Sequence, residues 1–271
     1  TVTAADGANY AEALAMSLYF FDANECGTEV DDNCLTWRGN CHTYDAEASL
    51  DSAANLSSSE KAMIKEANGG SNTVDVSGGY HDAGDHIKFN VTMGFAASSL
   101  AMSYYMNPGA YEKANCEGHF REVLKKTCDY LMKTTYLDNS GNVYAVCATV
   151  ANSADHDVTW EPPENQTYDR PTYWLTASYN NSVTTATMAS ALAGTAYVFK
   201  DVDAEYSAKC MKYSKALYDF AKKYPDMQDT TSGLYRLTDT YIDDLALAEV
   251  WFYINGEGSL PTYKPTANGC Y

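Results

Sequence analysis

Apolar residues recur along much of the chain at the spacing of one helical face. In Tyr10–Ala23, Leu14 and Leu18 fall on the same stripe together with two alanines, a pattern typical of an amphipathic helix. Strong helix breakers end several such segments, as Pro225 does after Ala204–Tyr224. The same pattern predicts further helices over Val91–Met106, Glu117–Thr134, Thr184–Phe199 and Asp243–Ile254.

Only one segment, Val143–Val150, has the composition of a β-strand. The predicted helices are joined by three long polar segments instead of short turns, namely Glu25–Asn55, Ala67–Asn90 and Ala151–Val183. Connections of that length inside a domain are usually functional or disordered, and these contain Trp, His, Cys and paired Asp residues. The pattern therefore predicts an all-α domain whose function resides in its long loops.

The formal net charge of −18 at pH 7 makes nucleic acid and an anionic membrane surface unsuitable partners. An acidic surface is compatible with an extracellular protein that acts on a neutral polymer. No stretch is apolar for long enough to span a bilayer, and no charged segment followed by an apolar one opens the chain. Thr1 is therefore expected to be a mature N-terminus of a secreted protein.

Eight cysteines are too many for incidental thiols of an ordinary cytosolic protein, so disulfides or a metal are expected. Six of them have no metal-like spacing. We expect some disulfides among these six, although the sequence does not assign the pairs. They are Cys34, Cys116, Cys128, Cys147, Cys210 and Cys270.

The most informative segment is Val74–Asn90, in which Asp82 and Asp85 lie in a glycine-rich loop directly before a predicted helix. Two carboxylates that face the same space can hold one water between them, and an ionised one can remove its proton as a general base. In an inverting glycosidase such a base stands about 6.5–9.5 Å from the opposing acid. The alternative is structural, either a side-chain turn or a helix N-cap from Asp85.

This segment resembles the G-G-[WY]-x-D-A-G-D-H-x-K-F signature of glycoside hydrolase family 9, the endoglucanases and related β-glucanases. The resemblance continues along nearly the whole chain, and the ordered set of matches is much more specific than any one of them. The further matching segments are Tyr10–Leu14, Tyr19–Phe21, Trp37–Gly39, Asp155–Glu164 and Tyr241–Leu245.

The resemblance implies an (α/α)6 toroid with an open substrate cleft, and cleavage of β-1,4-glucosidic bonds in cellulose or related β-glucans with inversion. Asp85 would be the general base, and Asp82 would help to hold the attacking water. Family members carry a glutamate general acid far downstream, which nothing in residues 1–271 matches. We therefore expect the N-terminal portion of one catalytic domain, inactive alone, whose partner is the missing C-terminal part.

A second candidate site consists of two cysteines and two histidines, the ligand types of a closed, four-coordinate zinc. They are Cys26, Cys41, His42 and His81. Some members of the family carry a structural zinc at matching positions, so the resemblance supports this grouping. Such a zinc would fasten the long loop after the first predicted helix beside the base. The alternative is a disulfide, Cys26–Cys41 or Cys34–Cys41, with both histidines merely polar.

The resemblance also implies a calcium site and contacts with sugar. Asp239, Asp243 and Asp244 stand near the family's calcium loop, although acids that favour a helix N-terminus are an equally good explanation. Aromatic faces stack on glucose rings and histidine supplies a directional hydrogen bond. Trp174 and Trp251 are assigned to the core. The residues expected along the cleft are His156, Trp160, Tyr235 and Trp37.

Two alternatives to an enzyme are open. A non-catalytic β-glucan-binding protein would have kept the cleft and lost the acid, but such a protein has no need of a water-activating pair. An unrelated all-α, disulfide-rich secreted domain leaves the ordered motifs unexplained. A cleft-facing glutamate opposite Asp85, in sequence after Tyr271 or in a second chain, would indicate the enzyme.

Overall fold

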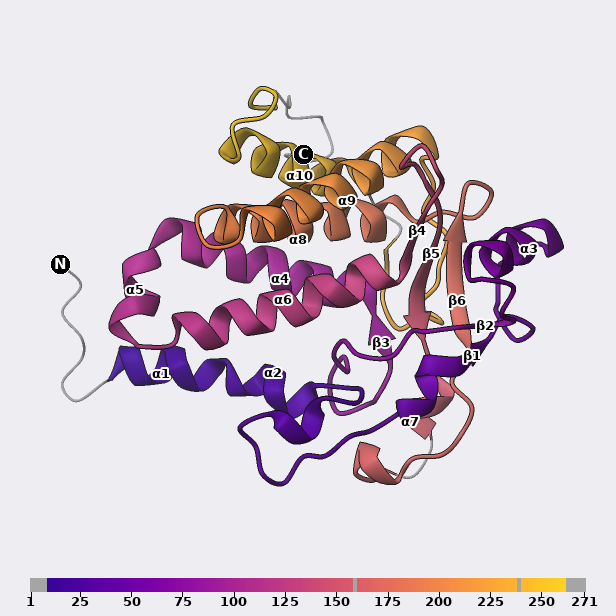
Figure 1. The fold of residues 1–271 in the computed structure, drawn as a ribbon, viewed down its shortest axis with the longest axis horizontal. Coiled ribbons are helices and arrows are strands. Elements are labelled where there is room, and N and C mark those ends of the chain that lie inside the picture. The colour runs from indigo at the N-terminus through magenta and orange to yellow at the C-terminus, as the bar shows by residue number, and fades with distance from the viewer. Residues whose placement is uncertain (1–8, 158–159, 238–239, 262–271) are drawn as a thin grey trace.

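The computed structural model describes residues 9–157, 160–237 and 240–261, without the side chains of residues 156 and 157. Most of this part is helical, and the longer helices run side by side across the molecule (Figure 1). They are α4 (Asn90–Met106), α6 (Glu117–Lys133), α8 (Ser182–Phe199), α9 (Ala204–Lys223) and α10 (Ile242–Ile254). The shorter ones are α1 (Tyr10–Ser17), α2 (Tyr19–Asn24), α3 (Ser58–Ala67), α5 (Pro108–Lys113) and α7 (Ala154–Asp157). Short 3-10 helices cover Val30–Asp32, Thr43–Glu47 and Pro163–Asn165.

The helices predicted from periodicity are confirmed, and five of the six have ends within two residues of the expected ones. The sixth, Tyr10–Ala23, is divided at the buried Leu18 into α1 and α2. The periodicity does not predict α3, although a capping box between Ser57 and Glu60 marks its start and could have revealed it.

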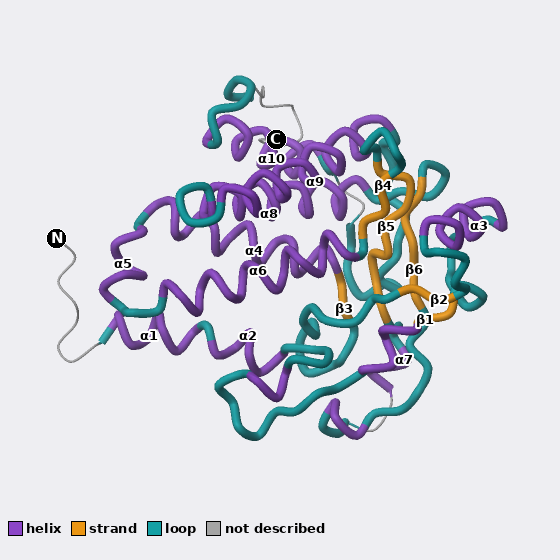
Figure 2. The backbone as a smooth tube through the Cα atoms, in the orientation of Figure 1, coloured by secondary structure: helices purple, strands orange, loops and turns teal. Residues whose placement is uncertain are grey.

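The prediction of a single strand is wrong, because β5 (Val143–Val150) is the centre of a four-stranded antiparallel sheet. β6 (Thr172–Thr176) lies along one edge of β5, and β3 (Lys88–Phe89) and β4 (Thr135–Leu137) pair with the other edge (Figure 2). These partner strands are two to five residues long, too short for an alternating pattern to stand out. A separate two-stranded sheet consists of β1 (Ala48–Ser49) and β2 (Thr73–Val74).

Helix α8 lies at the centre of the helical layer and packs against α4, α9 and α10. It is rich in Ala, Thr and Ser, and nearly all of it is buried. Small residues permit this packing, since a Cβ on Gly194 would lie 2.8 Å from Ala101 Cβ and 3.0 Å from the Trp251 ring. Trp251 and Trp174 are fully buried, which confirms their assignment to the core.

The seven described cysteines are all free, so the disulfides predicted among them are wrong. The same finding contradicts a Cys26–Cys41 or Cys34–Cys41 disulfide, and Cys270 lies outside the described residues. Several of the thiols are packed in hydrophobic clusters, where a thiol acts as a small hydrophobe. These are Cys116, Cys128, Cys147 and Cys210. Disulfides would have supported the prediction that the protein is secreted. Without them, secretion stays a prediction. None of the described helices has the length and apolarity to cross a membrane.

Candidate active site and metal centre

Residues 78–89, which we call the aspartate loop, carry Asp82 and Asp85 and end in β3. The loop closes because the Asp82 amide donates to the Ile87 carbonyl at 2.9 Å, and the Ile87 amide donates to Asp85 Oδ1 at 3.0 Å. The side-chain turn considered for Asp85 is therefore present. The N-cap is not, because α4 begins at Asn90 without a side-chain cap. Asp85 is buried, at 4 % exposure, and Asp82 is half-buried.

Tyr235 contacts the aspartate loop at two places. Its hydroxyl donates to Asp82 Oδ2 at 2.6 Å, and its ring packs edge-on against Phe89 at the end of the aspartate loop. Burial raises the pKa of the Tyr235 hydroxyl well above its ordinary value, and the hydrogen bond to Asp82 and the charges of Asp82 and Asp85 raise it further. The Tyr235 phenol is therefore bound directly to Asp82, and it lies within electrostatic reach of Asp85.

Two glycines of the aspartate loop let aromatic rings lie against its backbone. A Cβ on Gly79 would come within 2.8 Å of the Tyr130 ring. A Cβ on Gly84, between the two aspartates, would come within 2.5 Å of the Trp160 indole. Trp160 is nevertheless 67 % exposed, so its ring borders the aspartate loop and still faces solvent. A ring in that position can stack on a sugar bound at the aspartates.

The other sugar-binding candidates lie on nearby segments. Trp37 is 68 % exposed on the loop after α2, and His156 lies in α7 with its side chain outside the described residues. Two segments that carry the family resemblance do meet in the structure. Arg38 Nε pairs with Glu164 Oε1 at 2.8 Å, and the Gly39 amide donates to the same oxygen at 3.0 Å.

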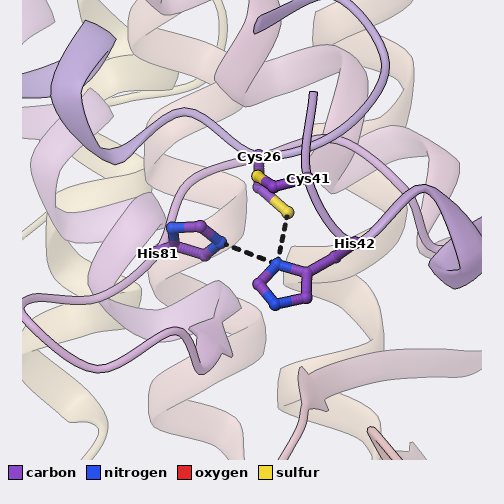
Figure 3. A group of neighbouring side chains, drawn as sticks. All are labelled: Cys26, Cys41, His42 and His81. Atoms are coloured by element: carbon purple, nitrogen blue, oxygen red, sulfur yellow. Dashed lines mark hydrogen bonds between the residues drawn. The ribbon is translucent and has the colours of Figure 1, made fainter. Parts of the chain in front are cut away.

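The four predicted metal ligands meet in one buried cluster (Figure 3). One candidate ligand atom from each lies within 4.8 Å of all the others. Gly27 pairs with Cys41 across a β-bridge, and the His81 amide donates to the Asn24 carbonyl at 2.8 Å, which ties the aspartate loop to the same segment. Two thiols and two imidazoles at these separations fit a closed zinc site. The four are Cys26, Cys41, His42 and His81.

Neighbouring groups set the protonation of this cluster. His42 Nε2 lies 2.8 Å from Gln166 Oε1, which assigns the proton to Nε2 and leaves Nδ1 facing the cluster. Burial alone would raise the pKa of the Cys26 thiol, but the hydrogen bond from Cys41 and nearby positive charge hold it well below its ordinary value. Burial lowers the pKa of His81 to about 4. A thiolate and neutral imidazoles are the forms that bind zinc.

The predicted calcium ligands do not form a cluster in the part of the chain that the structure describes. Asp239 lies outside it, and Asp243 and Asp244 belong to no group of three or more candidate metal ligands there. Asp244 accepts a hydrogen bond from Thr187 Oγ1 at 3.1 Å, and burial together with the charge of Asp243 raises its pKa to about 7. Calcium stays a prediction.

Comparison with known proteins decides the family. The sequence profile of glycosyl hydrolase family 9 matches residues 10–269. The chain belongs to that family. It is 32 % identical to Endoglucanase B of Cellulomonas fimi and 29 % identical to Endoglucanase A of Bacillus pumilus, over 90 % and 91 % of its own length. These matches cover 21 % and 34 % of the two family relatives, so the chain spans about a fifth of the first and about a third of the second.

Two solved structures are similar to this family 9 chain. The catalytic domain of CelT from Clostridium thermocellum matches with a TM-score of 0.86 and 37 % identity. The cellulase Cel9M of C. cellulolyticum, also solved in complex with cellobiose, matches with a TM-score of 0.75 and 30 % identity. The matches cover 91 % and 92 % of this chain and 52 % of each solved chain. The chain therefore folds as part of an (α/α)6 barrel, which confirms the predicted fold class.

Proposed function

We propose that this family 9 chain supplies the water-activating side of an active site that hydrolyses β-1,4-glucosidic bonds in cellulose or a related β-glucan, with inversion. The observation that carries the proposal is the closed aspartate loop, in which the Ile87 amide holds Asp85 and the Tyr235 hydroxyl holds Asp82. The test is product analysis on cello-oligosaccharides with the complete catalytic domain. Inversion releases the α-anomer first, and initial release of the β-anomer would contradict the mechanism.

The two aspartates suit different roles. Asp85 is buried and held by the Ile87 amide, so its carboxylate keeps a fixed direction in which to take a proton from water. Asp82 is half-buried and bound by the Tyr235 hydroxyl, which suits it to hold that water in line. The acid of an inverting pair stands about 6.5–9.5 Å from the base. We assign it to a glutamate in the part of the catalytic domain that this chain does not span.

A neutral β-glucan is the substrate that these surroundings suit best. The indole of Trp160 borders the aspartate loop and faces solvent, where it can stack on the apolar face of a glucose ring. Trp37 and His156 would extend the contact to neighbouring sugar units. The net charge of −18 disfavours an anionic polymer. The cellobiose complex of the similar Cel9M supports the same substrate class.

The rest of the catalytic domain is the proposed partner of this chain. Helix α1 is largely apolar but contains no buried residue. Helix α10 is also apolar around most of its circumference, yet Ile242 and Tyr253 are 38 % and 51 % exposed. Helices of this kind normally lie in a protein interior. The two lie at opposite edges of the molecule, where the remaining part of the barrel would cover them (Figure 1).

We expect residues 1–271 alone to show no cellulase activity, because the general acid lies elsewhere. Activity should appear when the chain is produced together with the remainder of the domain, measured as release of soluble sugar from amorphous cellulose. The same mixture carrying Asp85→Ala should remain inactive. Robust hydrolysis by the isolated chain, lost in Asp85→Ala, would show that the acid lies within it.

Replacing Tyr235 by Phe should lower kcat/KM by about 10–100-fold, because a hydrogen bond to a charged acceptor is worth about 1.5–3 kcal/mol. The ring contact with Phe89 is kept, so the melting temperature should stay close to that of the wild type. Tyr179→Phe is a matched control, since it removes a hydroxyl that donates to the Asp229 carbonyl at 2.9 Å instead. Equal kinetics for the two variants would mean that Tyr235 does not assist Asp82.

We also propose that the cluster of two cysteines and two histidines holds a structural zinc. The donor types, their burial and the hydrogen bond from His42 to Gln166 support this assignment. When bound, the ion would stabilise the fold, because four protein ligands leave no open position for a substrate. The ligands lie in the segments around residues 26, 41 and 81, so binding would hold the first two segments against the aspartate loop.

A further inference from the structure

Four charged side chains are buried next to the aspartate loop and form an unbroken series of ion pairs. Lys88 Nζ lies 2.8 Å from Asp45 Oδ2, and Arg170 Nε lies 3.1 Å from Asp45 Oδ1. Arg170 Nη1 lies 3.6 Å from Asp155 Oδ2. None of the four side chains is more than 3 % exposed. We call this series, Lys88, Asp45, Arg170 and Asp155, the charge clamp.

Both ends of the charge clamp attach to the aspartate loop. Lys88 is itself a residue of that loop, and its ammonium donates to the carbonyls of Val76 and Gly78 at 2.6 and 3.1 Å. At the other end, Asp155 Oδ1 accepts a hydrogen bond from the His86 amide at 3.0 Å. His86 directly follows the proposed base in sequence. The backbone that carries the base is therefore held from both sides.

Stability alone does not account for the charge clamp. A buried ion pair loses about as much in desolvation as it gains in attraction, and apolar residues of similar size often stabilise a fold equally well. An open cavity of about 860 Å³ lies beside the clamp and is lined by Asp45, Asp155 and Arg170 among others. The hydrogen bonds of Lys88 and of Arg170 Nε are charge-assisted and directional, and the contact between Arg170 and Asp155 is an ion pair at 3.6 Å. Together they can fix segments at set positions beside such a space.

We propose that Asp155 and Arg170 are positioning residues for hydrolysis: through the charge clamp they fix the aspartate loop, and with it Asp85, relative to the bound sugar. The inference rests on the proposed function, because the charge clamp can position a general base only if Asp85 is that base. Misplacing a reacting group by about 1 Å can lower a rate by about 100-fold. The clamp contacts the loop backbone and not the carboxylate, so its loss should affect turnover more than substrate binding.

The test compares Asp155→Ala with Asp155→Asn in the complete catalytic domain. Alanine removes the acceptor of the His86 amide and the partner of Arg170, so kcat should fall by about 10–100-fold while KM changes by less than about threefold. Asparagine keeps an acceptor oxygen for the His86 amide and should recover at least part of the lost kcat. Wild-type kcat in a folded Asp155→Ala variant, or no recovery with asparagine, would overturn the proposal.

Amide hydrogen exchange on the 271-residue chain gives a readout that does not need activity. Asp155→Ala should speed exchange of the His86 amide by about tenfold or more without changing α8. Asp22→Ala is the matched control, because Asp22 is equally buried but pairs with His119 on α6, and it should leave His86 as in the wild type. Unchanged protection of His86 in Asp155→Ala would refute the clamp. If the wild-type domain does not cleave β-glucan, the proposed function is refuted. The exchange rate of the His86 amide would still test whether Asp155 holds the aspartate loop.

Discussion

Asp85→Asn is expected to lower kcat on cello-oligosaccharides by about 10²–10⁴-fold, the contribution of a general base. The amide has nearly the shape of the carboxylate and still offers an oxygen to the Ile87 amide, so the aspartate loop should keep its conformation. What the variant loses is the ability to accept a proton from water. Substrate binding, measured by calorimetry on the complete catalytic domain, should therefore change little.

A small anionic nucleophile provides a second readout for the same variant. Azide attacks the anomeric carbon without giving up a proton, so it does not need the base that Asp85→Asn lacks. The leaving sugar still takes its proton from the general acid, and the product is a glycosyl azide of inverted configuration. We expect azide to restore part of the turnover of Asp85→Asn and to leave the wild type unchanged.

The matched control is Asp75→Asn, the same substitution a few residues before the aspartate loop. The Asp75 side chain is 51 % exposed and bonds to Ser77 and Lys133, away from the aspartate pair. Its kcat should stay within about twofold of the wild type, as for most surface substitutions. If Asp85→Asn kept more than about a tenth of the wild-type kcat, Asp85 would not be the base.

The parts of the site that follow from near neighbours in sequence could be predicted. Asp82 and Asp85 lie in one loop because glycines and a short strand close it within a few residues, and that information is local. The helices were predictable for the same reason, since a buried stripe repeats along each one. The proposed zinc ligands come from three segments, and their grouping needed the family resemblance in addition to ligand chemistry.

The long-range partners could not be predicted in the same way. Tyr235 was expected to contact sugar, but its hydrogen bond to Asp82 spans 153 positions. Gln166 lies 124 positions from His42, and Arg170 lies 125 positions from Asp45. The spacing of motifs in the sequence does not tell which distant loops lie together. Those contacts depend on tertiary structure, such as the packing of α8 against other helices and the pairing of β5 with β6.

The expectation of disulfides failed for a different physical reason. A count of cysteines indicates oxidation only if the thiols lie within reach of one another, and composition carries no such geometry. In the structure Cys147 is a buried residue of the central strand β5, and Cys128 and Cys210 lie in the helical core. Their sulfur atoms fill space in the manner of small apolar groups.

Removal of zinc is expected to have the largest effect on the stability of the chain. Zinc at about 1,000 times its dissociation constant would stabilise the folded state by about 4 kcal/mol. For a chain of this size about 1 kcal/mol corresponds to about 2–4 °C in melting temperature, so chelation should lower it by about 10 °C. His81→Ala should have a similar effect without chelator, because three remaining ligands hold the ion less tightly.

The structural effect of zinc removal should extend to the aspartate loop, because the proposed zinc ligand His81 directly precedes Asp82. Loss of the ion would leave the hydrogen bonds from the Cys26 amide to the Gly79 carbonyl, and from the His81 amide to Asn24, as the main connections between the two segments. Amide exchange at residues 79–87 should then increase, and restored zinc should reverse the increase.

Cys116→Ala is the control, because it removes a buried thiol outside the cluster. This variant should keep both the bound metal and the protection of the aspartate loop from exchange. Protein purified without chelator that contains no stoichiometric zinc would contradict the assignment, and an intact mass lower by two hydrogens would indicate a cysteine pair instead.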